Sequence, residues 1–299
     1  MRRNDKDVMK IYNIFSDLMK VTTGGSLLNF GFWDNQVNHP FDAQMKLTSM
    51  LGIFGSFQNA KYILDVGSGY SIPAIKWLEE YPESNIYCID INYNQIVEGR
   101  HNLKKNQILD RQTLKTNSIA NLEKRLSHIN STSTFLGVKN DTMDRIVAFE
   151  SAHHFWPLEQ FVREARRILK RLGLLIIAIP VIVKTSKRIR CLEVRDLGIL
   201  KITWASEHYN IEFVKSLIEY NGFKIDEIRL IGSSVYQPLA EYYLNNRTYL
   251  RNVILNYYPN LLELIINKSM LRMKRASENG VIDYALFRCI KHSEVSYDS

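Results

Sequence analysis

The sequence has little of the cysteine that builds metal centres and disulfide frameworks. Its 299 residues contain three cysteines, Cys88, Cys191 and Cys289, which are scattered along the chain and form no Cys-x-x-Cys pair. Because zinc sites and small disulfide-rich folds need closely spaced cysteines, we expect neither in this protein.

Long apolar runs are also missing. The longest, at residues 172–183, is shorter than the roughly 18 residues that a membrane-spanning helix needs. The first residues, Met1 to Asp7, are mostly charged and lack the apolar core of a secretion signal. A composition of 45% hydrophobic and 23% charged residues is that of an ordinary globular protein. We therefore expect no membrane span and a cytoplasmic location.

Positive charge is concentrated in one segment. The formal net charge is +8, and residues 163–190 carry nine basic side chains against Glu164 alone. A general nucleic-acid-binding protein spreads its basic residues over a larger surface, so no nucleic-acid partner is expected. The basic residues at 163–171 are expected on an exposed helix face. The loop at 184–190 is either a solvated loop or a site that attracts an anionic acceptor, an acidic carrier protein or a membrane surface.

From Lys61 onward, short buried strands alternate with helices. Strands are predicted at residues 62–66, 85–90, 145–149, 174–179 (ended by Pro180), 223–231 and 280–291. Helices are predicted at 72–81, 93–105, 158–170 and 211–220. This alternation is typical of a parallel sheet with helices on both faces, which binds ligands at the carboxyl ends of its strands.

Other segments depart from this alternation. Before Lys61, the spacing predicts helices over 7–19 and 41–54, joined by a glycine-rich aromatic loop. Residues 236–275 read as a helical cap rich in tyrosine, most of it expected in the core. Residues 110–143 are polar and irregular, and part of this stretch reads as a surface insertion.

The strongest motif is a turn between a buried strand and a helix, Asp65-Val66-Gly67-Ser68-Gly69. Glycine permits positive φ and lets a ligand approach the backbone. A second acid, Asp90, ends the next strand, where its carboxylate can accept hydrogen bonds from ribose hydroxyls. Ile72 stands where a dinucleotide site needs a third glycine, which disfavours NAD. A carboxylate at Asp65 suits a cationic ligand instead.

These residues resemble the first motifs of class I S-adenosylmethionine-dependent methyltransferases, with Ser71 in place of the third glycine. The resemblance covers about residues 25–291. It implies S-adenosylmethionine as the cofactor and an α/β fold. That fold is a Rossmann-like, mostly parallel seven-stranded sheet with helices on both faces and a helical cap. It also implies that Asp65 lies near the methionine ammonium and that Asp90 binds the ribose.

The same resemblance extends the set of expected cofactor-binding residues. Many relatives carry Gly-Asp-Ala before strand four, whose acid binds the adenine amine, and Thr116-Asn117-Ser118 is the candidate counterpart here. The cofactor-binding residues implied in this way are Gly67, Ser68, Gly69, Ile91, Asn117, Ser118 and Trp33.

Two further stretches resemble one group within this family. Glu150-Ser151-Ala152-His153-His154 follows a buried strand and resembles the Glu-Ser-x-x-His stretch of enzymes that methylate macrolides, sugars, sterols and isoprenoids. Asn29-Phe30-Gly31-Phe32-Trp33 resembles the aromatic loop that closes over the cofactor in that group. His154 is the first candidate base for a hydroxyl acceptor and His153 the second. Glu150 is expected to orient a histidine, hold the methionine portion or act as the base of a C-methylation.

The predicted layout is an N-terminal part at 1–60 with helices and the cofactor-covering loop, a methyltransferase domain at 61–291 with an acceptor cap at about 236–275, and a tail at 292–299. The predicted activity is methyl transfer to a small-molecule acceptor, anionic or aromatic, most simply a hydroxyl of a specialised metabolite. C-methylation of an isoprenoid or prenyl diphosphate is the alternative. A non-catalytic cofactor-binding scaffold is the alternative of another class, and a homodimer is compatible with the sequence.

Overall fold

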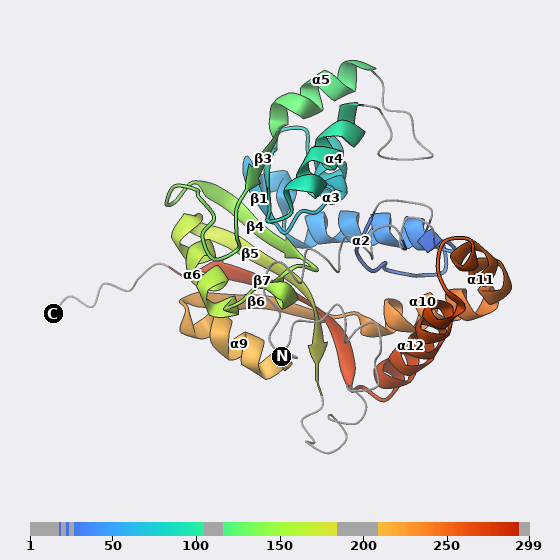
Figure 1. The fold of residues 1–299 in the computed structure, drawn as a ribbon. Coiled ribbons are helices and arrows are strands. Elements are labelled where there is room, and N and C mark those ends of the chain that lie inside the picture. The colour runs from blue at the N-terminus through green and yellow to red at the C-terminus, as the bar shows by residue number, and fades with distance from the viewer. Residues whose placement is uncertain (1–17, 19–21, 24–26, 105–115, 184–208, 293–299) are drawn as a thin grey trace.

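A single seven-stranded sheet runs through the molecule in the order β3-β2-β1-β4-β5-β7-β6 (Figure 1). The computed structural model describes residues 18, 22–23, 27–104, 116–183 and 209–292. Only β7 is antiparallel to its neighbours, β5 and β6. The strands are β1 (Tyr62–Val66), β2 (Asn85–Asp90), β3 (Leu126–Asn130), β4 (Met143–Phe149), β5 (Leu169–Ile182), β6 (Phe223–Leu230) and β7 (Ile282–Lys291). The predicted fold class is confirmed.

Helices cover both faces of this sheet (Figure 1). The helices beside the strands are α2 (Pro40–Phe54), α3 (Ile72–Glu80), α4 (Tyr93–Lys104), α5 (Thr116–Arg125), α6 (Leu158–Ile168) and α9 (Ile211–Tyr220). Neighbouring residues of a strand point to opposite faces. Ile63 of β1 therefore packs in the core formed with α2 and α3, and Leu64 in the core formed with α6 and α9.

One of the two helices predicted before Lys61 is α2. It begins one residue earlier than predicted, at Pro40, and His39 caps it by accepting a hydrogen bond from the Phe41 N–H at 3.2 Å. Proline suits the first position of a helix because its missing N–H would have no partner there. The other helix, predicted over 7–19, lies outside the described residues apart from Leu18.

Strand β3 was missed in the sequence, because it falls inside the segment at 110–143 that reads as polar and irregular. It lies at the edge of the sheet and pairs only with β2, from Leu126 opposite Ile86 to Asn130 opposite Asp90. An edge strand that is buried on part of one face needs few apolar residues. The strand therefore shows no hydrophobic pattern, because it contains the polar residues Ser127, His128 and Asn130.

Strand β5 is longer than predicted at both ends. The helix expected to reach Lys170 ends at Ile168, where α6 passes directly into β5. The expectation that Pro180 ends the strand was wrong, since Pro180 pairs with Tyr284 of β7 and the strand continues to Ile182. Pairing with β4 stops at Ala178, so at Pro180 the strand pairs with β7 alone. Proline is tolerated at such an edge because no second ladder bond is lost.

Three helices between β6 and β7 form the predicted cap: α10 (Tyr236–Asn245), α11 (Arg247–Leu255) and α12 (Asn260–Glu278). Glu263 of α12 is fully buried and is contacted by Tyr243 of α10 and Arg247 of α11 at 3.1 and 2.9 Å. The expectation that most cap tyrosines are core residues holds for Tyr236 and Tyr243, whereas Tyr249 and Tyr257 are exposed.

Candidate active site

A cavity opens at the carboxyl ends of β1, β2 and β4, where a parallel sheet binds its ligands. Its walls come from the glycine turn after β1, the residues after β2, the loop after β3, the stretch after β4 and the N-terminal residues 27–29. The cavity brings together eight of the residues singled out in the sequence: Asp65, Gly67, Ser68, Gly69, Asp90, Ile91, Glu150 and His154.

The conformation of the glycine turn is set by its backbone angles and backbone hydrogen bonds. Gly67 has a φ of +79°, and a Cβ there would lie 2.3 Å from the Cβ of Ser151, so only glycine fits. Its N–H donates to the carbonyl of Ile89 at 2.7 Å. Gly69 has a φ of +53°, and its N–H donates to Asp90 Oδ2 at 2.7 Å. The turn after β1 is thereby joined to the acid after β2.

Ser71, which replaces the third glycine of the family motif, keeps the left-handed backbone of a glycine. Its φ is +59°, a region that is costly for other residues. The Ser71 hydroxyl shares a hydrogen bond with His128 Nε2 at 3.1 Å. Burial lowers the pKa of His128 to about 4, so this histidine is neutral at neutral pH. The departure from the motif thus preserves the shape of the turn.

Two buried carboxyl groups give the cavity its electrostatic character. Asp65 is 1% exposed, and burial, followed by the negative charge of Asp90, raises the pKa of Asp65 to about 8. Burial also raises the pKa of Asp90, although backbone N–H groups of Asn92 and Gly69 donate to its carboxylate at 2.8 and 2.7 Å. A cationic ligand would compensate this burial, as the sequence argument for Asp65 requires.

Two amide side chains lie on the cavity wall: Gln95, which sequence reasoning missed, and Asn29, which it named only as part of the aromatic loop. Gln95 lies in the first turn of α4 and is 5% exposed, and its Nε2 has no hydrogen-bond partner within the described ranges. Asn29 is 6% exposed, and its Oδ1 likewise has none. A signal existed for Gln95, which follows the acid of strand two by five residues at the start of a helix. Unpaired buried polar atoms facing a cavity indicate contacts with a ligand.

The loop after β3 lies on the cavity wall at Ser131–Thr134, within the stretch interpreted as an insertion. Of the predicted adenine contacts, Asn117 and Ser118 fall in α5, before β3, and their side chains lie outside the described residues. The cavity-lining residues that follow β3 are therefore hydroxyl side chains, and Thr132 and Thr134 share a hydrogen bond at 3.0 Å.

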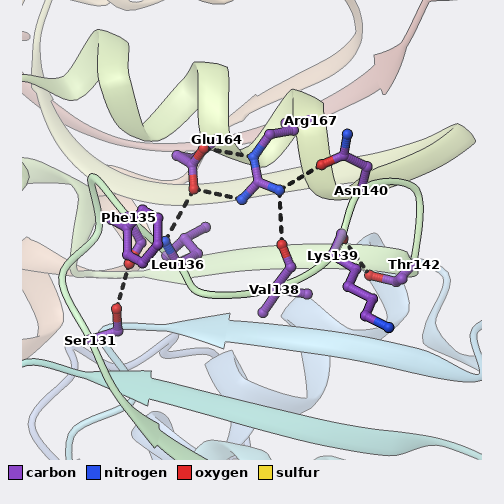
Figure 2. A network of polar contacts seen from close by, with 9 residues as sticks. All are labelled: Ser131, Phe135, Leu136, Val138, Lys139, Asn140, Thr142, Glu164 and Arg167. Atoms are coloured by element: carbon purple, nitrogen blue, oxygen red, sulfur yellow. Dashed lines mark hydrogen bonds and ion pairs between the residues drawn. The ribbon is translucent and has the colours of Figure 1, made fainter.

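Helix α6 holds the segment that continues from this loop toward β4 (Figure 2). Glu164 accepts a hydrogen bond from the Leu136 N–H at 3.1 Å. Arg167 donates to the Val138 carbonyl at 2.8 Å and to Asn140 Oδ1 at 2.7 Å, and it is paired with Glu164. The interpretation of the basic helix as a plain exposed face is therefore wrong for Arg167. The basic loop at 184–190 lies outside the described residues.

Glu150 lies at the end of β4 and lines the cavity. Both of its carboxylate oxygens accept the Phe30 N–H, at 2.8 and 3.0 Å, and Oε1 also accepts the Tyr284 hydroxyl at 2.7 Å. Burial raises the pKa of Glu150 to about 8, against the lowering effect of these hydrogen bonds.

The two histidines point into different surroundings. His154 lines the cavity, whereas His153 is 6% exposed and is not part of its wall. Burial lowers the pKa of His153 to about 3, which makes it a neutral side chain of the interior. The two rings are in contact, with centroids 3.9 Å apart and planes inclined by 48°. The geometry therefore favours His154 as the group that faces an acceptor.

Trp33 is not on the cavity wall. It is 7% exposed, its ring packs against Tyr242 of the cap at 5.6 Å, and its backbone N–H donates to the Ser234 carbonyl at 2.8 Å. The aromatic loop reaches the cavity through Asn29 instead. The contact predicted between Trp33 and the cofactor stays a prediction.

Comparison with known proteins agrees with this geometry. Residues 64–177 match the family model described as a methyltransferase domain. Erythromycin 3''-O-methyltransferase of Saccharopolyspora erythraea is 26% identical over 166 residues, which are 56% of this chain and 50% of that protein. Methyltransferase GfsG of Streptomyces halstedii is 24% identical over 225 residues, 75% of this chain and 74% of that protein.

Solved structures share the fold. The cyclopropane synthase MmaA2 from Mycobacterium tuberculosis superposes with a TM-score of 0.74 at 14% identity, covering 97% of this chain and 99% of that one. The [4+2]-cyclase SpnF superposes with a TM-score of 0.72 at 16% identity, covering 98% and 97%.

The sheet order, the glycine turn and the match of residues 64–177 to a methyltransferase domain support a class I S-adenosylmethionine-dependent methyltransferase. The same findings indicate S-adenosylmethionine as the cofactor. The chain spans about half the length of the erythromycin relative that it matches, so the reaction and the acceptor of the whole protein are proposals.

The cavity fits this cofactor by its own chemistry. It presents two buried carboxyl groups for a cationic ligand with ribose hydroxyls, together with a buried amide donor on Gln95 and a buried amide acceptor on Asn29. In the described part of the chain, no three His, Cys, Asp or Glu side chains gather in a way that would hold a metal ion. No helix of that part is long and apolar enough to cross a membrane.

Proposed function

We propose that this protein transfers the methyl group of S-adenosylmethionine to a hydroxyl group of a small specialised metabolite. One observation carries the proposal: the cavity combines the buried carboxyl groups of Asp65 and Asp90 with His154 on the same continuous wall. The alignment with a relative named as an O-methyltransferase supports the choice of a hydroxyl.

In this proposal the residues around the glycine turn hold the cofactor. Asp65 would accept the methionine ammonium, Asp90 and Gln95 would bind the ribose, and Gly67 and Gly69 would let the backbone approach it. Ser131–Thr134 would contact the adenine through hydroxyl groups in place of the family's acid. Ser68 and Ile91 complete the wall.

When bound, S-adenosylmethionine supplies an electrophilic methyl group on a sulfonium that leaves as a neutral thioether. The protein is left with two tasks, which are to align the acceptor with that methyl group and to remove the hydroxyl proton. His154 would take the proton because it lies on the cavity wall. His153 would support its ring from the interior, at a centroid distance of 3.9 Å.

The acceptor side would be formed by the cap at 236–275 and the N-terminal part at 1–60. Phe30 packs edge-on against Tyr236 at 5.3 Å, and Trp33 packs against Tyr242, so the aromatic loop and the cap are joined. Added elements of this kind, rather than the sheet, set specificity in widely used folds. An aromatic or anionic acceptor follows from the aromatic cap and the basic loop at 184–190.

C-methylation of an isoprenoid or prenyl diphosphate is the second candidate. The observation that favours it is Glu150, a carboxyl group on the cavity wall whose pKa burial raises to about 8, in the range of a general base. A non-catalytic cofactor-binding scaffold is the alternative of another class.

Calorimetric titration with S-adenosylhomocysteine tests the proposed site. The wild-type protein should bind it with micromolar affinity, and Asp90→Ala should bind it at least about tenfold more weakly, because a charged hydrogen-bond partner of the ribose is lost. Asp226→Ala on β6 is the matched control: it removes the same charge from a residue paired with Arg288 and should bind like the wild type. If the wild-type protein binds neither S-adenosylmethionine nor S-adenosylhomocysteine, the proposal is wrong.

A further inference from the structure

Three distant parts of the chain meet at the carboxylate of Glu150. The Phe30 N–H reaches it across 120 residues and donates to both oxygens, at 2.8 and 3.0 Å. The Tyr284 hydroxyl of β7 reaches it across 134 residues and donates to Oε1 at 2.7 Å. The end of β4, the aromatic loop and β7 are thus tied together through one side chain.

The backbone at Glu150 is strained to make this arrangement. Its φ is +51°, in the left-handed region that a residue with a long side chain rarely adopts. Such strain persists only where the surrounding structure imposes it, and it concentrates at functional sites. The Glu150 N–H is held by the Ala178 carbonyl at 2.9 Å, which fixes this residue to β5.

Two tyrosine rings pack against Phe30, the residue whose N–H donates to Glu150. The ring of Phe30 packs edge-on against Tyr236 at 5.3 Å and against Tyr284 at 6.3 Å. Tyr236 and Tyr284 are both fully buried. Tyr284 therefore contacts the loop through its ring on Phe30, and the end of β4 through its hydroxyl on Glu150.

Within this arrangement the protein orients the carboxyl group of Glu150 through both of its oxygens. The Phe30 N–H is shared by the two oxygens and the Tyr284 hydroxyl donates to Oε1, so the side chain is held toward the Phe30 loop and β7. The neighbouring residues Leu28 and Asn29 line the cavity. The position of the Phe30 loop consequently sets the shape of that wall.

We propose that Glu150 and Tyr284 are positioning residues that clasp the Phe30 loop to the end of β4 and so form one wall of the cofactor cavity. Glu150 acts through the loop rather than as the base. The inference rests on the proposed function only in taking the cavity as the cofactor site, since the clasp itself is a property of the protein alone.

Hydrogen–deuterium exchange of the Phe30 amide in the cofactor-free protein tests the clasp, together with titration with S-adenosylhomocysteine. Glu150→Gln should speed exchange of that amide about tenfold, because only one oxygen then remains to accept the Phe30 N–H. Tyr284→Phe should speed it about threefold, because the hydroxyl that orients Glu150 is lost. Both variants should weaken binding of S-adenosylhomocysteine by similar factors.

Tyr243→Phe is the matched control. Tyr243 is a buried tyrosine that donates to a buried glutamate, Glu263, in the cap. Its removal should lower the melting temperature while leaving exchange at Phe30 and binding of S-adenosylhomocysteine unchanged. If Glu150→Gln does not fold, Tyr284→Phe decides alone, because it removes a single hydroxyl.

The outcomes separate the alternatives. Unchanged Phe30 exchange and unchanged binding in both variants would overturn the clasp and leave Glu150 free to act as a base on the acceptor. Faster Phe30 exchange in a protein whose wild type does not bind S-adenosylhomocysteine would support the clasp and refute the proposed function.

Discussion

Four residues at the edge of the cofactor cavity hold left-handed backbone angles: Gly67, Gly69, Ser71 and Glu150. At Gly67 the angle is combined with a close approach, since an added Cβ would lie 2.3 Å from Ser151. At Ser71 and Glu150, hydrogen bonds to His128 and from Phe30 and Tyr284 accompany the unfavourable angle. Each residue therefore carries a conformational constraint in addition to its chemistry.

Gly67→Ala should destabilise the protein by about 3 kcal/mol, from left-handed strain and from overpacking against Ser151. It should also abolish detectable binding of S-adenosylhomocysteine, because the turn must move. Gly137→Ala is the control: Gly137 also has a positive φ, of +65°, but no atom within 4 Å of an added Cβ. It should cost about 1 kcal/mol and leave binding intact. Denaturant unfolding and calorimetry measure both effects, and equal losses in the two variants would contradict the steric argument.

At the scale of elements, α6 acts on the cavity from a distance. Its Glu164 and Arg167 hold the segment between β3 and β4, whose first residues line the cavity (Figure 2). Within the described residues, this segment forms no strand pairing with the sheet, and its one β-bridge is the isolated bridge between Thr132 and Phe135. Side chains of a neighbouring helix thus replace the backbone pairing that would otherwise fix a loop.

Arg167→Ala should lower stability by about 2 kcal/mol and weaken binding of S-adenosylhomocysteine several-fold, since it removes charged hydrogen bonds to the Val138 carbonyl and Asn140. Arg163→Ala on the same helix is the matched control. Arg163 is exposed and pairs with Glu159, so its loss should change stability by no more than about 0.5 kcal/mol and leave binding unchanged. A binding loss in the control variant alone would argue against this role of Arg167.

At the scale of the whole molecule, buried titratable groups make stability depend on pH. Burial raises the pKa of Asp65 and of Glu150 to about 8, so between about pH 4 and 8 the folded state binds protons that the unfolded state has released. These groups make stability fall as pH rises through that window. Burial lowers the pKa of His153 and His128 to about 3 and 4, and these groups make stability rise up to about pH 6.5.

The cofactor-free protein should therefore lose stability between about pH 6.5 and 8, where only the carboxyl groups act. Asp65→Asn should reduce this loss, because one of the carboxyl groups with a raised pKa no longer titrates. Thermal unfolding measured at several pH values checks the slope, with Asp226→Asn as the control of equal charge change. A slope that is unchanged in Asp65→Asn would contradict the raised pKa of Asp65.

The sequence by itself determined where most strands lie along the chain and the position of the cofactor turn. Apolar runs such as Tyr62–Val66 and Asn85–Asp90 are strong local signals, because a buried parallel strand is apolar on both faces. The glycines of the turn and the acids that flank it are also strong local signals, because their role is indicated by their neighbours in the chain. The methyltransferase resemblance followed from these local patterns.

Only the tertiary structure decided which residues meet. The Ser131–Thr134 loop lines the cavity through packing that no local pattern records, and Gln95 and Asn29 meet it there. His153 and His154 are adjacent in sequence, yet their different burial separates their roles. Glu150 is joined to Phe30 and Tyr284 across more than a hundred residues. The physical reason is that a parallel sheet brings the carboxyl ends of strands from distant parts of the chain to one edge. Hydrogen bonds between residues at that edge form only once the sheet has formed.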